Sequence, residues 1–152
     1  MSEAQVLLLF PRLSERGFKI TSPKDTGYNC IAWAAGDNRR WWQPGIIGQS
    51  LGLYYWPTLT DDTTLEVYEE AFASLGYVRC DNTDLEPGFE KIILYVDAHR
   101  SPTHAARQLS DGTWTSKLGK IEDICHLAPE GVCGKSYGEM EVIMRRSIGS
   151  NE

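Results

Sequence analysis

A chain of 152 residues is long enough to bury the core of one domain, and its net charge of -6 argues against nucleic acid or an anionic membrane as a partner. Hydrophobic residues make up 41% and charged residues 24%, ordinary globular values that exclude wholesale disorder. No apolar run is long enough to span a bilayer, and no signal segment is convincing. We therefore expect a single cytoplasmic domain over residues 1–152, with its four cysteines as free thiols.

The N-terminal part predicts short helices around one cysteine. Residues 2–13 predict a short helix, and residues 18–21 alternate like a brief strand. In residues 26–36 a polar loop leads into an apolar run that Gly36 closes, which predicts a short helix enclosed by protein. Cys30 then lies in the first turn, where unpaired N–H groups favour a thiolate. Taken alone, this cysteine is better interpreted as a small core residue.

Residues 37–57 predict a long irregular excursion near the cysteine, because glycines and Pro44 interrupt any regular pattern. This excursion carries the aromatic residues Trp41, Trp42, Tyr54, Tyr55 and Trp56. Most of these rings are expected to close the core beneath a loop. The alternative is a wall of a substrate cleft, since aromatic rings stack on sugars and peptide side chains.

The remainder of the chain predicts one amphipathic helix followed mainly by strands. The expected elements are a helix over 65–75, strands over 77–80 and 91–96, a short helix over 121–127 and a closing strand over 140–146. Helices gather early and strands late, which predicts an α+β domain. In it, an N-terminal helical layer carrying the cysteine packs on a C-terminal antiparallel sheet.

A predicted hairpin adds a histidine to this arrangement. Asp111 and Gly112 lie between two runs of strand-forming residues, a strong hairpin signal. His104 begins the first strand and Ser116 lies near the end of the second, so the turn should bring them close. A helix-borne cysteine facing such a histidine, with a polar residue on the next strand, is the arrangement of thiol hydrolases.

Residues 104–116 resemble the histidine hairpin of papain-like cell-wall peptidases of the NlpC type, and Cys30 preceded by Tyr28 resembles their nucleophile segment. The resemblance implies a papain-like fold with His104 as the base. Ser116 occupies the position of the third catalytic residue, where that family has a histidine or another orienting polar residue. More broadly, the chain resembles an uncharacterised bacterial family of single-domain proteins in segments 28–36, 104–109 and 114–119.

The predicted function is hydrolysis of an amide-type bond, which is a peptide, isopeptide or side-chain amide. Cys30 would attack the carbonyl to give a thioester, and His104 would protonate the leaving amine and then activate water. The oxyanion donors would be the Cys30 backbone N–H and a group from the preceding loop, with Tyr28 or Asn29 as candidates. Release of ammonia would make the protein a deamidase, and resolution by an amine would make it a transamidase.

The third catalytic residue and the substrate contacts stay open. Ser116 is preferred by position and Asp111 is second by chemistry, although Asp111 has a competing role in a type I′ turn. A bare cysteine–histidine dyad is a further alternative. The expected substrate contacts are Trp41, Trp56 and Trp114.

No cofactor and no metal are expected, because the histidines and cysteines lack tight zinc spacing. His126 is expected to be a capped or surface histidine. The expected partner is a peptide or protein substrate. The rival interpretation is a catalytically inactive binding or interaction module that uses the aromatic segment 41–56 as its interface.

Overall fold

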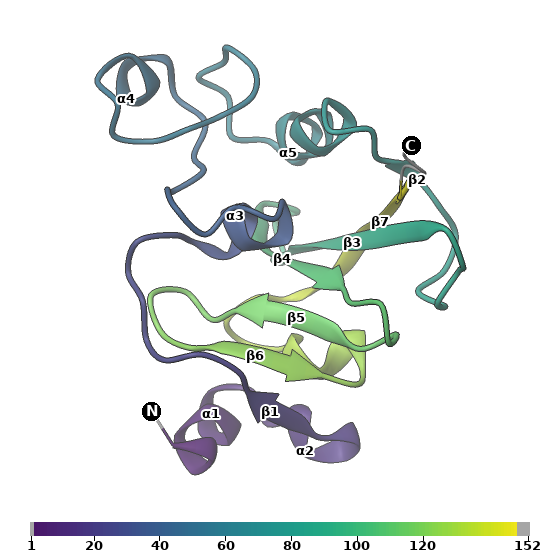
Figure 1. Cartoon of the computed structure of the whole chain (residues 1–152). Coiled ribbons are helices and arrows are strands. Elements are labelled where there is room, and N and C mark those ends of the chain that lie inside the picture. Colours follow the sequence, from purple (N-terminus) through teal and green to yellow (C-terminus); the bar gives the residue numbers. More distant parts are fainter. Residues whose placement is uncertain (1, 149–152) are drawn as a thin grey trace.

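The computed structural model describes residues 2–148, which form a mixed α+β structure around one seven-stranded sheet (Figure 1). Every pairing between neighbouring strands is antiparallel, in the order β1-β6-β5-β4-β3-β7-β2. The strands are β1 Phe18–Ile20, β2 Val78–Arg79, β3 Phe89–Val96, β4 Pro102–Gln108, β5 Trp114–Lys117, β6 Asp123–His126 and β7 Glu139–Ser147. The helices are α1 Glu3–Leu9, α2 Leu13–Arg16, α3 Cys30–Ala34, α4 Ile46–Ser50, α5 Leu65–Ala73 and the 3₁₀ helix η1 Pro129–Val132.

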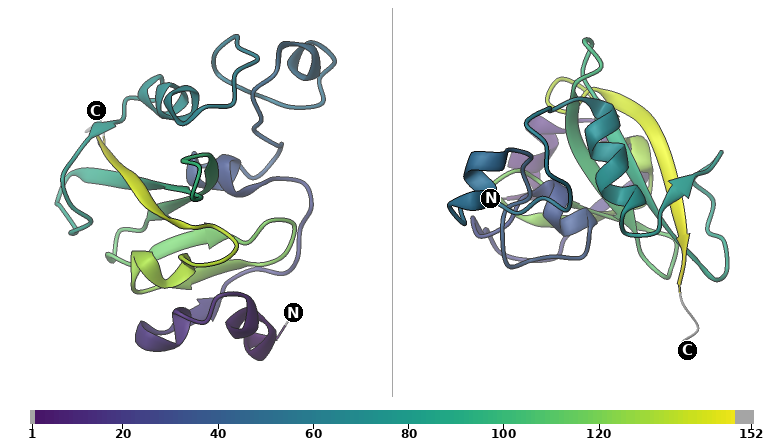
Figure 2. Two further views of the ribbon diagram at one scale, coloured as in Figure 1. Left: turned by 180° about the vertical axis from the view of Figure 1, so that it is seen from behind. Right: turned by 90° about the horizontal axis from the view of Figure 1, so that it is seen from above.

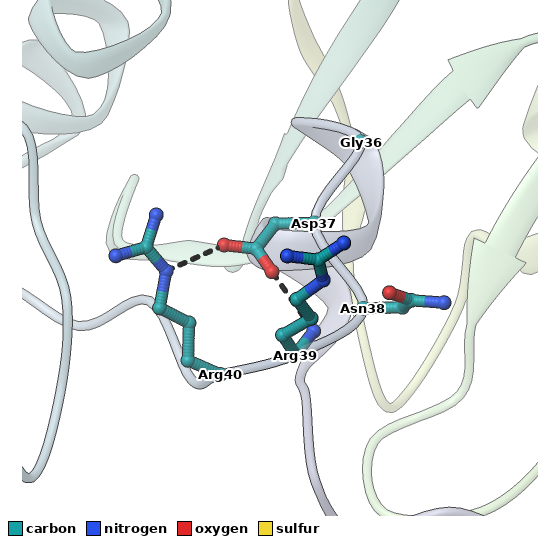
Figure 3. Close-up of a pocket in the computed structure, with 5 residues that line it drawn as sticks. All are labelled: Gly36, Asp37, Asn38, Arg39 and Arg40. Atoms are coloured by element: carbon teal, nitrogen blue, oxygen red, sulfur yellow. Dashed lines mark hydrogen bonds and ion pairs between the residues drawn. The ribbon is translucent and has the colours of Figure 1, made fainter.

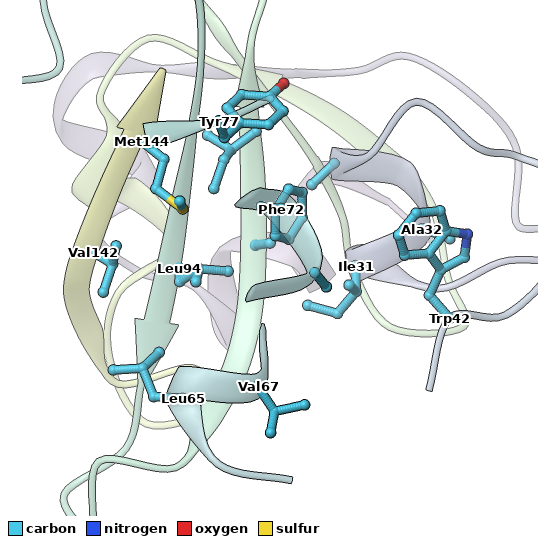
Figure 4. Packing of buried hydrophobic residues seen from close by; sticks show 14 of the residues in the cluster. Ile31, Ala32, Trp42, Leu65, Val67, Phe72, Tyr77, Leu94, Val142 and Met144 are labelled. Atoms are coloured by element: carbon cyan, nitrogen blue, oxygen red, sulfur yellow. The ribbon is translucent and has the colours of Figure 1, made fainter. Parts of the chain in front are cut away.

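Each face of the sheet carries its own hydrophobic core. Because side chains alternate along a strand, β3 directs Ile92 and Leu94 to one core and Ile93 and Tyr95 to the other. The first core lies beneath α3 and α5, and Figure 4 shows side chains of both helices packed beside Leu94. The second core is closed by α1, α2 and η1. In Figures 1 and 2, α4 lies apart from the sheet, at the far end of the excursion that precedes α5.

Most of the expected elements are present. The expected strands over 91–96 and 140–146 are the cores of β3 and β7, and the expected helix over 65–75 is α5 with Thr64 as its N-cap. Within residues 2–148, no helix combines the length and the apolar character needed to cross a membrane.

The helix predicted over residues 121–127 is wrong, because this segment contains strand β6. Asp123 and Cys125 point to one face of the sheet, while Ile124 and His126 point to the other. β6 pairs with β5 on one side and β1 on the other. Long-range pairing therefore decides the conformation of a segment whose local pattern is ambiguous.

The hairpin between β4 and β5 is confirmed, but the predicted type I′ turn is not. A type I′ turn needs a positive φ at both central residues, whereas Gly112 has φ 89° and Asp111 does not have a positive φ. The Asp111 carboxylate instead accepts hydrogen bonds from the backbone N–H and hydroxyl of Thr113. The turn closes through the Leu109 N–H, which donates to the Thr113 carbonyl at 2.7 Å.

Candidate active site

Asn29 fixes the start of α3 and attaches it to the aromatic excursion. Its side-chain oxygen accepts from the N–H of Ala32 at 3.2 Å and from the N–H of Trp42 at 3.1 Å. Its amide nitrogen donates to the Trp42 carbonyl at 2.9 Å. This confirms Cys30 as the first residue of the helix. The Trp42 carbonyl takes one of the two amide hydrogens of Asn29, so the expectation that Asn29 is an oxyanion donor stays a prediction.

The loop before Cys30 is anchored to β5 and β6. The Tyr28 hydroxyl donates to the Asp123 carboxylate at 2.6 Å, and burial together with this contact raises the pKa of Tyr28 to about 12. The Lys117 ammonium donates to the Asp25 carbonyl and lies 5.0 Å from the centre of the Tyr28 ring. The Tyr28 hydroxyl therefore holds the loop in place, which corrects its expected role as an oxyanion donor.

The Cys30 sulfur is a protonated thiol at neutral pH. Cys30 is partly exposed as a residue, but burial of the sulfur raises its pKa to about 11. The nearby backbone N–H groups of Ala105, Ile31 and Cys30 itself favour the thiolate, as does the charge of Lys117. These contacts oppose the effect of burial without overcoming it.

A separation between β4 and β5 gives the sulfur its position. The two strands pair at only two positions, Arg107 with Thr115 and Gln108 with Trp114. Beyond these pairs, Ala105 has no partner on β5, and its backbone N–H lies near the Cys30 sulfur. The thiol therefore lies at the gap between the strands, beside the residue that follows His104.

His104 and Ser116 meet on the other side of this gap. Alternation along β4 turns Ala105 toward α3 and His104 toward the second core, where its ring is fully buried. The imidazole Nε2 lies 3.0 Å from the Ser116 hydroxyl oxygen, which confirms that the hairpin brings these two residues together. One face of the His104 ring stacks on the ring of Tyr137, with the ring centroids 4.0 Å apart and the ring planes within 7° of each other.

Tyr137 is the residue that covers the His104 ring. Burial raises its pKa, and negative charge on Cys30 would raise it further, so the sulfur lies within electrostatic reach of the ring that covers His104. Among residues 2–148, no hydrogen bond joins the Cys30 sulfur to the His104 ring directly. The imidazole Nδ1 is buried and has no hydrogen-bond partner in the described part of the chain.

His126 is the site residue that sequence reasoning missed. Its Nε2 lies 2.8 Å from the Ser116 oxygen, and its Nδ1 lies 2.8 Å from the Ala128 carbonyl. The ring is 1% exposed, so the expectation of a capped or surface histidine is wrong. In a strand, alternation puts His126 on the same face as Ile124, which would have indicated that the histidine is buried. This pattern can be used only when the segment is recognised as a strand.

Both buried histidines are expected to make the protein less stable in mild acid. Burial lowers the pKa of His104 well below 6.5 and that of His126 to about 4. As the pH falls below 6.5, the unfolded chain binds protons at these rings and the folded chain does not. The free energy of unfolding should therefore decrease by up to about 1.4 kcal/mol per pH unit for each ring. Urea unfolding between pH 7 and pH 5 measures this slope, which His126→Gln should roughly halve.

The expected aromatic substrate contacts divide into buried and accessible rings. Trp56 and Trp114 are fully buried in the first and second cores, so neither ring is placed to meet a substrate, which corrects that expectation. Trp41 is partly exposed and donates from its indole nitrogen to the Thr26 carbonyl at 2.7 Å. It lines an open pocket of about 510 Å³ together with Thr26, Leu53, Tyr54 and Lys120.

A second, polar pocket of about 580 Å³ lies just beyond the C-terminal end of α3 (Figure 3). Asp37 accepts from the Arg40 guanidinium at 2.7 Å and from the indole N–H of Trp42 at 2.9 Å.

Asp111 is exposed and bonds within its own turn, away from His104. No group of three or more histidine, cysteine, aspartate or glutamate side chains suited to a metal ion occurs within the described residues.

No curated protein and no solved structure matches this chain. The model of one family, described as "Domain of unknown function (DUF7689)", matches residues 19–145. The matched region runs from β1 into β7 and contains Cys30, His104, Ser116 and His126. Because this match covers most of the chain, the protein belongs to the DUF7689 family.

Proposed function

We propose that this protein is a papain-like cysteine hydrolase that cleaves an amide-type bond through a thioester on Cys30. The observation that best supports this is the nearness of the Ala105 backbone to the Cys30 sulfur, which puts the thiol beside the residue that follows His104. The arrangement of a helical layer carrying the cysteine on an antiparallel sheet carrying His104 agrees with the proposal.

The reaction begins from a neutral pair, because burial raises the pKa of Cys30 and lowers that of His104. As the sulfur attacks the carbonyl carbon, Nδ1 of His104 takes the thiol proton. The same proton then passes to the amine nitrogen as the carbon–nitrogen bond breaks, leaving a thioester. In the second half, Nδ1 accepts a proton from water as the water attacks the thioester. That proton returns to the departing sulfur.

Backbone groups are the candidates for oxyanion stabilisation. The Tyr28 hydroxyl donates its only proton to Asp123, so the backbone N–H groups of Cys30 and Ile31, at the start of α3 and near the sulfur, take that role. The pocket beside Trp41 includes Thr26, from the loop that leads to Cys30, and an apolar or aromatic substrate side chain fits its aromatic lining.

The proposal predicts selective acylation of Cys30. We expect an activated ester such as 4-nitrophenyl acetate to transfer its acyl group to Cys30 of the folded protein, as detected by peptide mass spectrometry. Cys30→Ala should remove this adduct and all turnover in a screen of peptide, isopeptide and peptidoglycan substrates. Cys125→Ala is the matched control, because Cys125 is another partly exposed cysteine and should not be required.

Acylation of Cys80 or Cys125 at the same rate as Cys30, or of Cys30 only after unfolding, would contradict the proposal. Deamidation and transamidation use the same two side chains, so the products separate them. Ammonia release identifies a deamidase, and a new amide formed with an added amine identifies a transamidase.

A specific observation also favours the interaction module as a second candidate. The short helix α4 has no buried residue; its Ile47 is 75% exposed and the C-cap residue Leu51 that follows it is 69% exposed. Scattered exposed aliphatic residues are common, but several on one short excursion are typical of a contact surface. Trp42 and Trp56 are buried, so these aliphatic side chains rather than the indole rings would form the interface. An interaction module needs no thiol and would keep its function in Cys30→Ala.

A further inference from the structure

We propose that His126 is a positioning residue of this site, and that it acts through Ser116 to set the tautomer of His104. The two rings and the hydroxyl between them form one buried chain of hydrogen bonds that ends on the Ala128 carbonyl. The catalytic consequence of this chain rests on the proposed function, whereas the tautomer itself does not.

The donor and acceptor in each of these hydrogen bonds follow from the last one, at the Ala128 carbonyl. A carbonyl oxygen can only accept, so Nδ1 of His126 carries the hydrogen that it donates to Ala128 at 2.8 Å. The ring is neutral at pH 7, since burial lowers its pKa to about 4, and Nε2 is therefore an acceptor. The Ser116 hydroxyl lies 2.8 Å away and donates its single proton to this nitrogen.

With its proton given to His126, the Ser116 oxygen can only accept from His104. Nε2 of His104, at 3.0 Å, therefore carries a hydrogen. Because this ring is also neutral, its Nδ1 holds a free lone pair. That nitrogen is one of several buried side-chain atoms without a hydrogen-bond partner among residues 2–148, as expected for a base that awaits a proton donor.

A serine alone would not specify this arrangement. Its hydroxyl can donate to Nε2 of His104 as readily as it accepts from it, and donation would move the ring hydrogen to Nδ1, where it blocks the base. His126 removes that alternative by accepting the only proton that Ser116 has. The stack of Tyr137 on His104 holds the plane of the ring in place. His126 thereby supplies the orientation that a serine in this position cannot give by itself.

Nitrogen NMR of the 152-residue chain tests this directly. The chain contains three histidines, His99, His104 and His126, so their ring signals can be assigned by substitution. In long-range ¹H–¹⁵N spectra at pH 7, we expect protonated Nε2 and unprotonated Nδ1 for His104, and the reverse for His126. His126→Phe keeps a ring of similar size but removes the acceptor. It should convert His104 partly or wholly to the Nδ1–H tautomer.

Matched variants separate positioning from folding. His99→Gln changes an exposed histidine and should leave the His104 signals unchanged. Ser116→Ala interrupts the chain of hydrogen bonds at its centre. It should also allow His104 to adopt the Nδ1–H tautomer, so it is the variant to use if His126→Phe does not fold. In folded His126→Phe we expect acylation of Cys30 to slow by at least about tenfold, because the wrong tautomer lacks a base.

The outcomes distinguish this inference from the proposed function. An Nδ1–H tautomer in the wild-type protein, or an unchanged tautomer in folded His126→Phe, would overturn the role of His126. Wild-type acylation of Cys30 would still stand in that case. Conversely, if the expected tautomers are found but Cys30 is not acylated, the role of His126 in setting the tautomer stands and the proposed hydrolase function is contradicted.

Discussion

Replacing His104 by phenylalanine is expected to slow acylation of Cys30 at pH 7 by about 10²- to 10⁴-fold, the usual contribution of a positioned base. Phenylalanine preserves the stack on Tyr137 and the buried volume, so the loss reports on the base rather than on a cavity. Without the imidazole, reaction depends on the thiolate that forms spontaneously. With a pKa of about 11, this is on the order of 10⁻⁴ of the protein at pH 7.

The pH dependence makes this expectation specific. The thiolate fraction of the variant rises tenfold per pH unit up to about 11, whereas the wild-type base is already neutral at pH 7 because burial lowers its pKa well below 6.5. The difference in acylation rate between His104→Phe and the wild type should therefore shrink steadily as the pH is raised. Stopped-flow acylation between pH 6 and pH 10 measures both profiles, and His99→Phe provides the control. Parallel profiles for the variant and the wild type would show that His104 does not take the thiol proton.

Local signals in the sequence were sufficient for the parts of the site that depend on neighbouring residues. The N-cap residue Asn29, the first-turn Cys30 and the turn at Gly112 each act within a few positions of their own location. These signals placed the cysteine on its helix and brought His104 to Ser116. Caps and turns are decided by short-range hydrogen bonds, which a single sequence displays.

Contacts between distant segments account for what the sequence did not predict. Tyr28 reaches Asp123 across 95 positions, and this contact converts an expected oxyanion donor into an anchor. His126 joins the site only because β6 pairs with β5. The burial that raises the pKa of Cys30 and lowers that of His104 likewise depends on the packed structure, and no motif encodes its extent.

The segment between η1 and β7 shows how such a contact shapes the site. It supplies Tyr137, whose ring covers His104, although nothing in its local pattern points to a role. Gly134 and Gly138 exchange two backbone hydrogen bonds of 2.8 and 2.9 Å around this tyrosine. The Thr103 hydroxyl also donates to the Tyr137 carbonyl. The orientation of the histidine thus depends on the geometry of a glycine-closed loop.

Substitution of Gly138 by alanine should consequently have the largest effect on stability of any glycine change near the site. An added Cβ would lie 1.9 Å from the Val96 carbonyl oxygen, and the backbone φ of 74° is itself unfavourable for alanine. We expect the free energy of unfolding to fall by about 3 kcal/mol or more, because the obstacle is backbone and has no rotamer to adopt. Urea unfolding at pH 7 measures this loss.

Gly52→Ala is the matched control, since Gly52 has the same φ of 74° and nothing within 4 Å of the added Cβ. It should lose only the conformational contribution, about 1 kcal/mol. In whatever fraction of Gly138→Ala remains folded, relief of the clash must move the loop that carries Tyr137. The His104 ring then loses its stacking partner, and acylation of Cys30 should slow even at temperatures where the variant is fully folded. Equal stabilities for the two variants would mean that the Tyr137 loop shifts freely, and a loop that shifts freely does not hold the imidazole in one orientation.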